Sequence, residues 1–250
     1  MKIFAHRGGM GRAPENSLKA WQTALADGAD GFECDVVFTR DREPVIMHVP
    51  MRSFNVHRQT GYRLFLDRID WKDLCRYKTL GEPIVHLDEL LQFLSQNQIS
   101  CVIEPKRTDR LLVEKIVAGV KKFHVEDKVE MIGFYSRREN LIWAKRLLPS
   151  MRTSVITLWP FGDWPELCRT ARADAIVAGW KFANHWLTAD KLLRHLKEKI
   201  GAAQAAGIEV HLGLANSETD IKWAFDQCPD RIYSDDIRFL KQILKNHVHS

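Results

Sequence analysis

Short apolar runs alternate with longer amphipathic segments along most of this chain. The runs that predict strands are Lys2–His6, Gly31–Phe38, Pro44–His48, Ser100–Glu104, Val129–Phe134, Thr153–Leu158, Ala173–Ala178, Glu209–Leu214 and Asp230–Ser234. The first amphipathic segment places Leu18, Trp21, Ala24 and Leu25 on one helical face and ends at Gly28. The other predicted helices are Leu87–Leu94, Arg110–Lys122, Glu139–Leu148, Trp164–Ala171, Ala189–Ala206 and Ser217–Gln227. Strand alternating with helix predicts right-handed βαβ units around a parallel sheet.

Seven or eight such units in 250 residues favour a closed TIM-type (β/α)8 barrel that uses residues 1–250 as a single domain. One connection breaks the pattern, because only residues 39–43 join Gly31–Phe38 to Pro44–His48. This linker is too short for a helical crossover, so the pair is either a hairpin or a barrel strand beside a lesser one. Residues 49–82 are irregular, polar and basic, which predicts a small insertion after the strand that ends at His48.

Composition narrows the class of protein. With 45% hydrophobic and 28% charged residues the chain is globular, and no apolar run approaches the roughly 20 residues of a membrane span. We expect a cytoplasmic location, because no signal peptide is visible and the five cysteines contain no CxxC pair. A net charge of +5 mildly favours an anionic small-molecule substrate but is too small to indicate nucleic-acid binding.

Ionisable residues stand where several predicted strands end. His6 and Arg7 close the first strand, Glu33 and Asp35 lie two apart on the second, and His48 ends the third. Glu104 ends the next strand and Lys106 follows two residues later. The carboxyl ends of barrel strands form the mouth where active sites lie, so we expect these side chains to converge there.

Three converging carboxylates need compensation, because an unpaired buried charge costs several kcal/mol. A divalent cation with oxygen ligands, Mg²⁺ or Ca²⁺, would supply it at Glu33, Asp35 and Glu104. The alternative is a structural network in which these carboxylates pair with Arg or Lys.

Two histidines and two cations complete the candidate chemistry. His6 and His48 are candidates for general acid and base, because imidazole ordinarily titrates near neutral pH. Arg7 and Lys106 could bring positive charge to a phosphate, or could pair with the carboxylates instead. The remaining histidines are assigned structural roles: His57, His86, His124, His185, His195, His211, His247 and His249.

Five sequence stretches together resemble the glycerophosphodiester phosphodiesterase family. They are His6-Arg7-Gly8, Ala13-Pro14-Glu15-Asn16-Ser17, Ala29-Asp30-Gly31-Phe32-Glu33-Cys34-Asp35-Val36, Pro44-Val45-Ile46-Met47-His48 and Ile103-Glu104-Pro105-Lys106. The resemblance implies a TIM-type barrel that holds a divalent metal on Glu33, Asp35 and Glu104. It also implies an acid–base pair of His6 and His48, with Arg7 and Lys106 as phosphate contacts.

The implied reaction cleaves a small glycerophosphodiester to glycerol 3-phosphate and an alcohol. The neighbouring glycerol hydroxyl attacks phosphorus, and water then opens the cyclic phosphate. Two other readings stay open at this point: a phospholipase D-like enzyme that acts on lysophospholipids, and a non-catalytic barrel that binds phosphodiesters.

The chain departs from the family pattern at two places. Val49 stands where the family usually has Asp after the second histidine, and Gly213 stands where it has Trp. We expect the phosphodiester chemistry to be retained and the pocket around the alcohol or the glycerol to be altered, with space at Gly213. The segment Trp159–Pro165 could replace the missing aromatic wall or contact lipid, or it could pack over its own helix.

Overall fold

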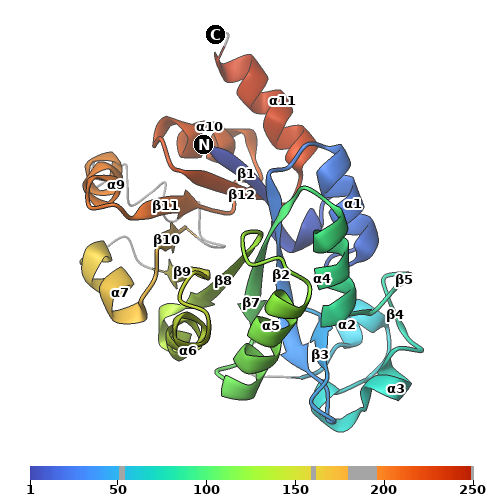
Figure 1. The fold of residues 1–250 in the computed structure, drawn as a ribbon. Coiled ribbons are helices and arrows are strands. Elements are labelled where there is room, and N and C mark those ends of the chain that lie inside the picture. Colours follow the sequence, from blue (N-terminus) through green and yellow to red (C-terminus); the bar gives the residue numbers. More distant parts are fainter. Residues whose placement is uncertain (51–53, 159–161, 180–195, 249–250) are drawn as a thin grey trace.

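A closed barrel of parallel strands forms the body of the molecule. The structure is a computed structural model, and it describes residues 1–250 except 51–53, 159–161, 180–195 and 249–250. In this part of the chain the barrel strands are β1 (Lys2–Ala5), β2 (Gly31–Phe38), β7 (Ser100–Pro105), β8 (Val129–Phe134), β9 (Arg152–Thr157), β10 (Ala175–Ala178), β11 (Glu209–Leu212) and β12 (Arg231–Ser234). The ring closes because β1 pairs in parallel with both β12 and β2. The predicted TIM-type barrel is therefore confirmed (Figure 1).

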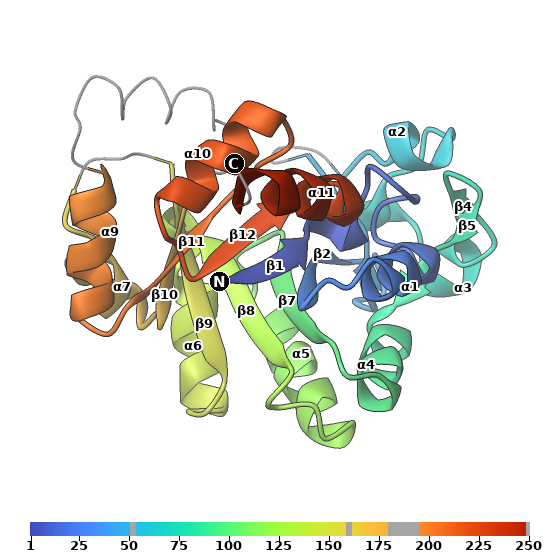
Figure 2. The ribbon, with the colours of Figure 1, turned by 90° about the horizontal axis from the view of Figure 1, so that it is seen from above.

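Helices surround this ring, as Figure 2 shows from above. They are α1 (Leu18–Ala26), α4 (Leu87–Gln96), α5 (Arg110–Lys122), α6 (Glu139–Leu147), α7 (Trp164–Ala171), α9 (Leu196–Ala205), α10 (Glu218–Asp226) and α11 (Ile237–Val248). Several begin at a side chain that accepts a backbone hydrogen bond, such as Ser17, Asp109 and Ser217. Among the described residues, no helix combines the length and the apolar character that crossing a membrane requires.

Side chains alternate between the two faces of the barrel wall. Outward residues such as Phe32, Cys34 and Ile103 join the main core between strands and helices. An inward layer fills the middle of the barrel and consists of Phe4, Val102, Ile132, Ile156, Val177, Leu214 and Tyr233. Because inward positions alternate, Glu104 lies one inward position beyond Val102, towards the carboxyl end of β7.

The short connection at residues 39–43 makes a hairpin. β3 (Pro44–Ile46) runs antiparallel to β2, with Ile46 opposite Val36, and β6 (Val85–His86) pairs antiparallel with β3. β3 is therefore outside the barrel ring, which settles the alternative that the sequence left open.

The described part of residues 49–82 contains short elements, gathered at one side of the barrel beyond β3 (Figure 1). These are α2 (His57–Thr60), α3 (Trp71–Leu74), β4 (Lys78–Thr79) and β5 (Glu82–Pro83). Together with β2 and β3 they enclose a separate apolar cluster, made of Val37, Val45, Met47, Val49, Val56, Leu66, Leu74 and Ile84.

One predicted helix has a different buried face, and one helix of the structure was not predicted. In α1 the buried residues are Ala20, Trp21 and Ala24, whereas Leu18 and Leu25 are 45% and 36% exposed. The predicted apolar face was therefore rotated, because Trp21 packs on Phe32 and sets which side of α1 meets the barrel. α11 was not predicted, although Ile237, Leu240, Ile243 and Leu244 bury one of its faces.

Candidate active site

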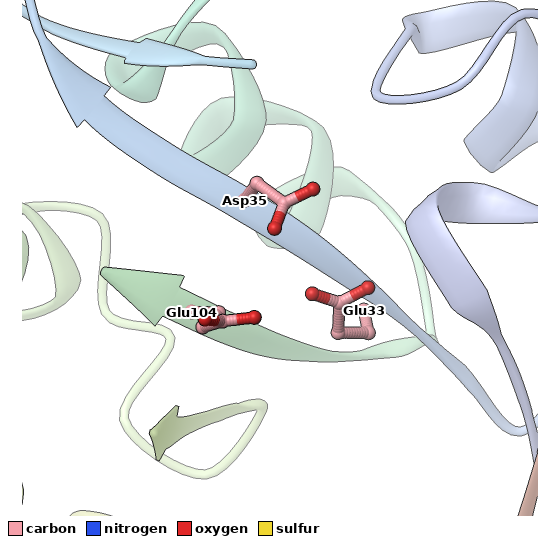
Figure 3. Close-up of side chains that lie close together, drawn as sticks. All are labelled: Glu33, Asp35 and Glu104. Carbon is pink, nitrogen blue, oxygen red and sulfur yellow. The ribbon is translucent and has the colours of Figure 1, made fainter. Parts of the chain in front are cut away.

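Three carboxylates meet at the carboxyl ends of β2 and β7. Asp35 lies directly opposite Glu104 in the parallel register, and Glu33 is two residues before Asp35 on the same face. One oxygen from each of the three lies within 4.8 Å of the others, and all three residues are at most 1% exposed (Figure 3). The convergence expected from the sequence is thus present in the structure.

Glu33 has the weakest compensation of the three carboxyl groups. Burial raises the pKa of its carboxyl well above the ordinary value, and the Asp35 and Glu104 carboxylates raise it further. Its Oε2 accepts a hydrogen bond of 3.0 Å from the Arg7 backbone N–H, while Oε1 is buried and accepts none from any described residue. An oxygen-rich group with a buried, unpartnered oxygen fits a hard divalent cation.

Asp35 is stabilised as an anion by its surroundings. Its Oδ1 lies 2.8 Å from Lys106 Nζ, and its Oδ2 lies 3.3 Å from Arg7 Nε and accepts a 3.0 Å hydrogen bond from Asn16 Nδ2. Burial by itself would raise the pKa of Asp35, but the charges of Lys106, Arg7 and His48 outweigh it and hold that pKa well below its ordinary value.

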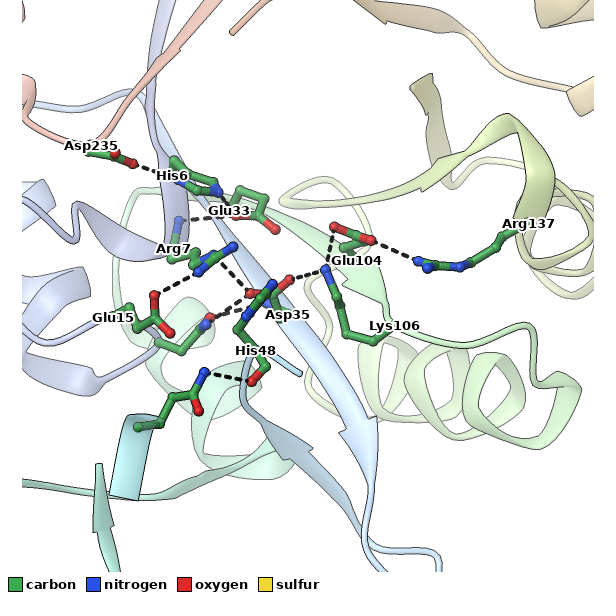
Figure 4. Close-up of polar contacts among 12 residues, drawn as sticks. His6, Arg7, Glu15, Glu33, Asp35, His48, Glu104, Lys106, Arg137 and Asp235 are labelled. Atoms are coloured by element: carbon green, nitrogen blue, oxygen red, sulfur yellow. Dashed lines mark hydrogen bonds and ion pairs between the residues drawn. The ribbon is translucent and has the colours of Figure 1, made fainter. Parts of the chain in front are cut away.

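The two predicted phosphate contacts are engaged with carboxylates in this structure. Lys106 Nζ bridges Asp35 and Glu104 at 2.8 and 3.0 Å, and these carboxylates raise its pKa although burial opposes them. Arg7 Nη1 donates to Glu15 Oε2 at 2.7 Å. The pairing alternative therefore describes the arrangement of both cations, as Figure 4 shows. Only Arg7 also lines the cavity described below.

His6 begins a tight turn that follows β1. The turn continues through Gly8, where a Cβ would lie 2.8 Å from both Ala20 Cβ and Trp21 Cδ1, so only glycine allows this approach to α1. His6 Nδ1 lies 2.6 Å from Asp235 Oδ1, and Nε2 lies 3.9 Å from Glu33 Oε2. The imidazole is thereby fixed beside the carboxylate cluster.

His48 reaches the same region from the hairpin. Its backbone carbonyl accepts a 3.1 Å hydrogen bond from Gln59 Nε2 in α2, which ties the position to the insertion. His6, Arg7 and His48 all line a cavity of about 700 Å³. The two imidazoles that the sequence selected thus face one cavity beside the carboxylate cluster.

Glu15, Asn16, Arg137 and Asp235 belong to this network, although none of the four was predicted as a site residue. Arg137 Nη1, from the turn after β8, lies 3.2 Å from Glu104 Oε1. No pattern in the sequence pointed to Arg137. Asp235 follows the end of β12 as His6 follows the end of β1, so the strand-end rule applied to every strand could have found it.

The two departures from the family pattern have structural explanations. Val49 is 1% exposed and packs in the apolar cluster of the insertion. A Cβ on Gly213 would lie 3.0 Å from Tyr233 Cβ, and Gly213 does not line the cavity, whereas Leu214 does. The expectation of open space at Gly213 was therefore wrong, because Tyr233 occupies that side.

The described residues of the segment Trp159–Pro165 and the other described histidines lie outside the catalytic cavity. Trp164 is 1% exposed, packs in the main core and is not among the residues that line the catalytic cavity, while Trp159 lies outside the described residues. His86 caps α4, and His211 is buried inside the barrel. His57, His124 and His247 lie away from the cavity lining, and His185, His195 and His249 lie outside the described residues.

Comparison with known proteins identifies the family of this chain. Residues 6–238, which include the whole network from His6 to Asp235, match the sequence model of the Glycerophosphoryl diester phosphodiesterase family. The chain belongs to this family. A relative within the family is the glycerophosphodiester phosphodiesterase of Bacillus altitudinis, 29% identical over 169 residues. That match covers 63% of this chain and 66% of the relative, slightly less than two thirds of its length.

Other relatives match over more of the chain. The human lysophospholipase D GDPD3 is 26% identical over 289 residues, covering 99% of this chain and 86% of that protein. Among solved structures, the Oleispira antarctica phosphodiesterase in complex with the product sn-glycerol-3-phosphate superposes with a TM-score of 0.79 at 20% identity, covering 98% and 97% of the two chains. A glycerophosphodiester phosphodiesterase from Parabacteroides distasonis gives a TM-score of 0.79 at 19% identity, covering 99% and 98%. These structures share the barrel fold of this chain.

Proposed function

We propose that this protein is a metal-dependent enzyme that hydrolyses glycerophosphodiesters to glycerol 3-phosphate and an alcohol. The observation that carries the proposal is the convergence of Glu33, Asp35 and Glu104 beside a cavity that His6 and His48 line. Membership of the phosphodiesterase family supports it.

Glu33, Asp35 and Glu104 are the proposed holders of Mg²⁺ or Ca²⁺, on the strength of their oxygen donors and the unpartnered Glu33 Oε1. A bound divalent cation would stabilise the negative charge on the phosphoryl oxygens. In the same proposal one imidazole accepts the proton of the glycerol hydroxyl that attacks phosphorus, and the other donates a proton to the leaving alkoxide. Both histidines line the cavity where the diester would lie.

Arg7 and Lys106 have two tasks in this proposal. In the absence of substrate, Lys106 neutralises Asp35 and Glu104, and Arg7 adds positive charge beside Asp35. Arg7 also lines the cavity, so its guanidinium can bind a phosphate oxygen without leaving Glu15.

An assay on glycerophosphocholine tests the proposal directly. Protein stripped of metal with EDTA should be inactive and should recover on addition of Mg²⁺ or Ca²⁺. His6→Ala and His48→Ala should each lose about 100-fold or more in kcat, because a positioned acid or base typically contributes 10²–10⁴-fold. His57→Ala, an exposed histidine outside the cavity, is the matched control and should keep full activity. Full activity of the stripped protein or of both active-site variants would overturn the proposal.

A lysophospholipase D-type activity is the second candidate, and the human relative that spans 99% of this chain favours it. The test compares lysophosphatidylcholine with glycerophosphocholine at equal concentration, below and above the micellar threshold. Faster release of choline from the lysolipid would select this alternative. The same assays exclude the non-catalytic binding barrel if either diester is turned over.

We further propose that residues 1–250 act as a single domain in the cytoplasm. In support of a reducing compartment, Cys34, Cys75, Cys101, Cys168 and Cys228 are all free thiols. Detection of the protein outside the cytoplasmic fraction of its own cells would contradict that location.

A further inference from the structure

The insertion contains a second cavity next to the catalytic one. It has a volume of about 830 Å³ and lies between α2, α3 and the loop before β5. Arg58, Gln59 and Leu80 line both cavities, so the two adjoin at these three residues. We call this second cavity the insertion groove.

Positive charge dominates the insertion groove. Arg58, Arg76 and Lys78 line it, against one carboxylate, that of Asp73. Arg76 Nη1 lies 3.8 Å from Asp73 Oδ1 at an exposed site, where such a pair is weak. In the part of the chain that the structure describes, Arg58 and Lys78 make no ion pair. The groove therefore offers cationic groups to a ligand from the catalytic side.

Gln59 stands at the junction of the two cavities with one polar atom unused. The residue is 94% buried (6% exposed), and its Nε2 is fixed by the His48 carbonyl at 3.1 Å. Its Oε1 is buried and accepts no hydrogen bond from the described residues. A buried acceptor without a partner costs free energy, and a ligand hydroxyl at this point would remove that cost.

Two tyrosines form one wall of the groove. The rings of Tyr62 and Tyr77 meet edge to face with centroids 5.1 Å apart, and Tyr62 is 57% exposed. Their phenol groups and ring faces suit a ring-shaped polyol better than a flexible alkyl chain.

We propose that the insertion groove binds the leaving alcohol of the diester and selects a polyhydroxylated alcohol that carries a phosphate monoester. This inference rests on the proposed function, because the scissile phosphate must lie between His6 and His48. The alcohol then extends past Gln59 Oε1, which accepts one of its hydroxyl hydrogens, and its phosphate reaches Arg58, Arg76 and Lys78.

Three substrates that differ in the charge of the alcohol test the inference. Glycerophosphoinositol 4-phosphate and glycerophosphoinositol share their hydroxyl groups and differ by one phosphate, and glycerophosphocholine has a cationic alcohol. We expect kcat/KM for the phosphorylated diester to exceed that for its unphosphorylated partner by about 10-fold, since each exposed charge pair contributes a factor of about two to five. The preference should disappear at about 1 M salt, where the Debye length is about 3 Å.

Substitutions locate the preference in the groove. In Arg76→Gln/Lys78→Gln, the ratio of kcat/KM between the two inositol diesters should fall about five-fold. Lys72→Gln, an exposed lysine of α3 that does not line the groove, should keep the ratio of the unmodified protein. An unchanged ratio in the double variant, or a preference for the choline diester, would overturn the inference.

A binding measurement separates this inference from the proposed function. Calorimetry on His6→Ala, with the same pair of inositol diesters as ligands, reports on the groove without turnover. The unmodified protein could hydrolyse no diester while calorimetry shows tighter binding of the phosphorylated diester. If that difference in affinity then disappears when Arg76→Gln/Lys78→Gln is added, only the catalytic proposal fails. If glycerophosphocholine is hydrolysed but neither ratio nor affinity depends on the phosphate, only the groove proposal fails.

Discussion

His6 Nδ1 lies 2.6 Å from Asp235 Oδ1, in a contact that joins the first and last strands of the barrel. Ala5 pairs with Ser234 in the parallel register of β1 and β12, which places the next residue of each strand side by side. Asn216 Nδ2 donates to Asp235 Oδ2 at 2.7 Å. Burial would raise the pKa of Asp235, but the hydrogen bond and charge of His6 hold it below the ordinary value. A charged Asp235 can hold the His6 ring in one orientation toward the cavity.

Asp235→Asn should therefore impair catalysis without unfolding the protein. We expect kcat to fall about 10- to 100-fold, within the range that acid–base catalysis contributes, with little change in KM. Steady-state kinetics on glycerophosphocholine measures the effect. Asp236→Asn is the matched control, because Asp236 accepts the Phe239 backbone N–H and Asn caps a helix equally well. Equal kcat in both variants would show that Asp235 does not act through His6.

Arg137→Ala should change metal affinity in the opposite direction from a ligand substitution. The guanidinium lies 3.2 Å from Glu104 Oε1 and competes electrostatically with any cation at the carboxylate cluster. We expect tighter Mg²⁺ or Ca²⁺ binding and a loss of about 2 kcal/mol in the metal-free free energy of unfolding, because Lys106 is then the one cation left beside Glu104 among the described residues. Calorimetric titration and urea denaturation give the two quantities. Arg138→Ala is the control, since Arg138 contacts its own turn through Tyr135. Weaker metal binding in Arg137→Ala would contradict this account.

Val49→Asp should fail to restore the family pattern. Val49 packs with Val45, Val56 and Leu66, so the new carboxylate would be buried among apolar side chains. We expect a loss of about 3 kcal/mol or more in the free energy of unfolding, and no gain in kcat/KM. Thermal and urea unfolding measure the loss, and Val49→Thr, which keeps the shape, should lose about half as much or less. A stable and more active Val49→Asp would mean that this position faces the active site.

His211 and Glu130, two buried groups inside the barrel, should make the free energy of unfolding depend on pH. Burial holds the pKa of His211 below its ordinary value, the Arg231 charge lowers it further, and Glu209 opposes them. Burial would raise the pKa of Glu130, but Arg231, 2.9 Å away, together with His211 and Ser154 holds it below the ordinary value. Both groups bind fewer protons when folded than when unfolded, so the free energy of unfolding should rise with pH between about 4 and 7.

The histidine part of that slope can be isolated. Neutral His211 stabilises the fold above its ordinary pKa of about 6.5, and this contribution is lost as the pH falls below that value. Urea denaturation at several pH values should show a decline of about 1 kcal/mol between pH 7 and about 5 that is absent in His211→Asn. The same decline in both proteins would assign the pH dependence to other groups.

The local pattern of apolar and polar residues predicted several helices and strands and the placement of Glu33 and Asp35 on one strand face. The predicted bounds of β2, β8, α5 and α7 agree with the structure, because each has a strong apolar period or a cap of its own. The two-residue spacing of Glu33 and Asp35 placed both on one strand face, and that deduction holds wherever the strand lies. Tertiary packing overrode the pattern at Leu18 and Leu25, since the stacking of Trp21 on Phe32 decides which face of α1 is buried.

The sequence by itself determined the βαβ order, the strand-end residues His6, Glu33, Asp35, His48 and Glu104, and their suitability for phosphodiester chemistry. Only the tertiary structure decided which distant groups meet them. Closure of the barrel brings Asp235 to His6, the register of β2 and β7 lets Lys106 bridge Asp35 and Glu104, and the turn after β8 supplies Arg137. Those contacts depend on strand order and register, which hydrophobic periodicity along one segment does not encode.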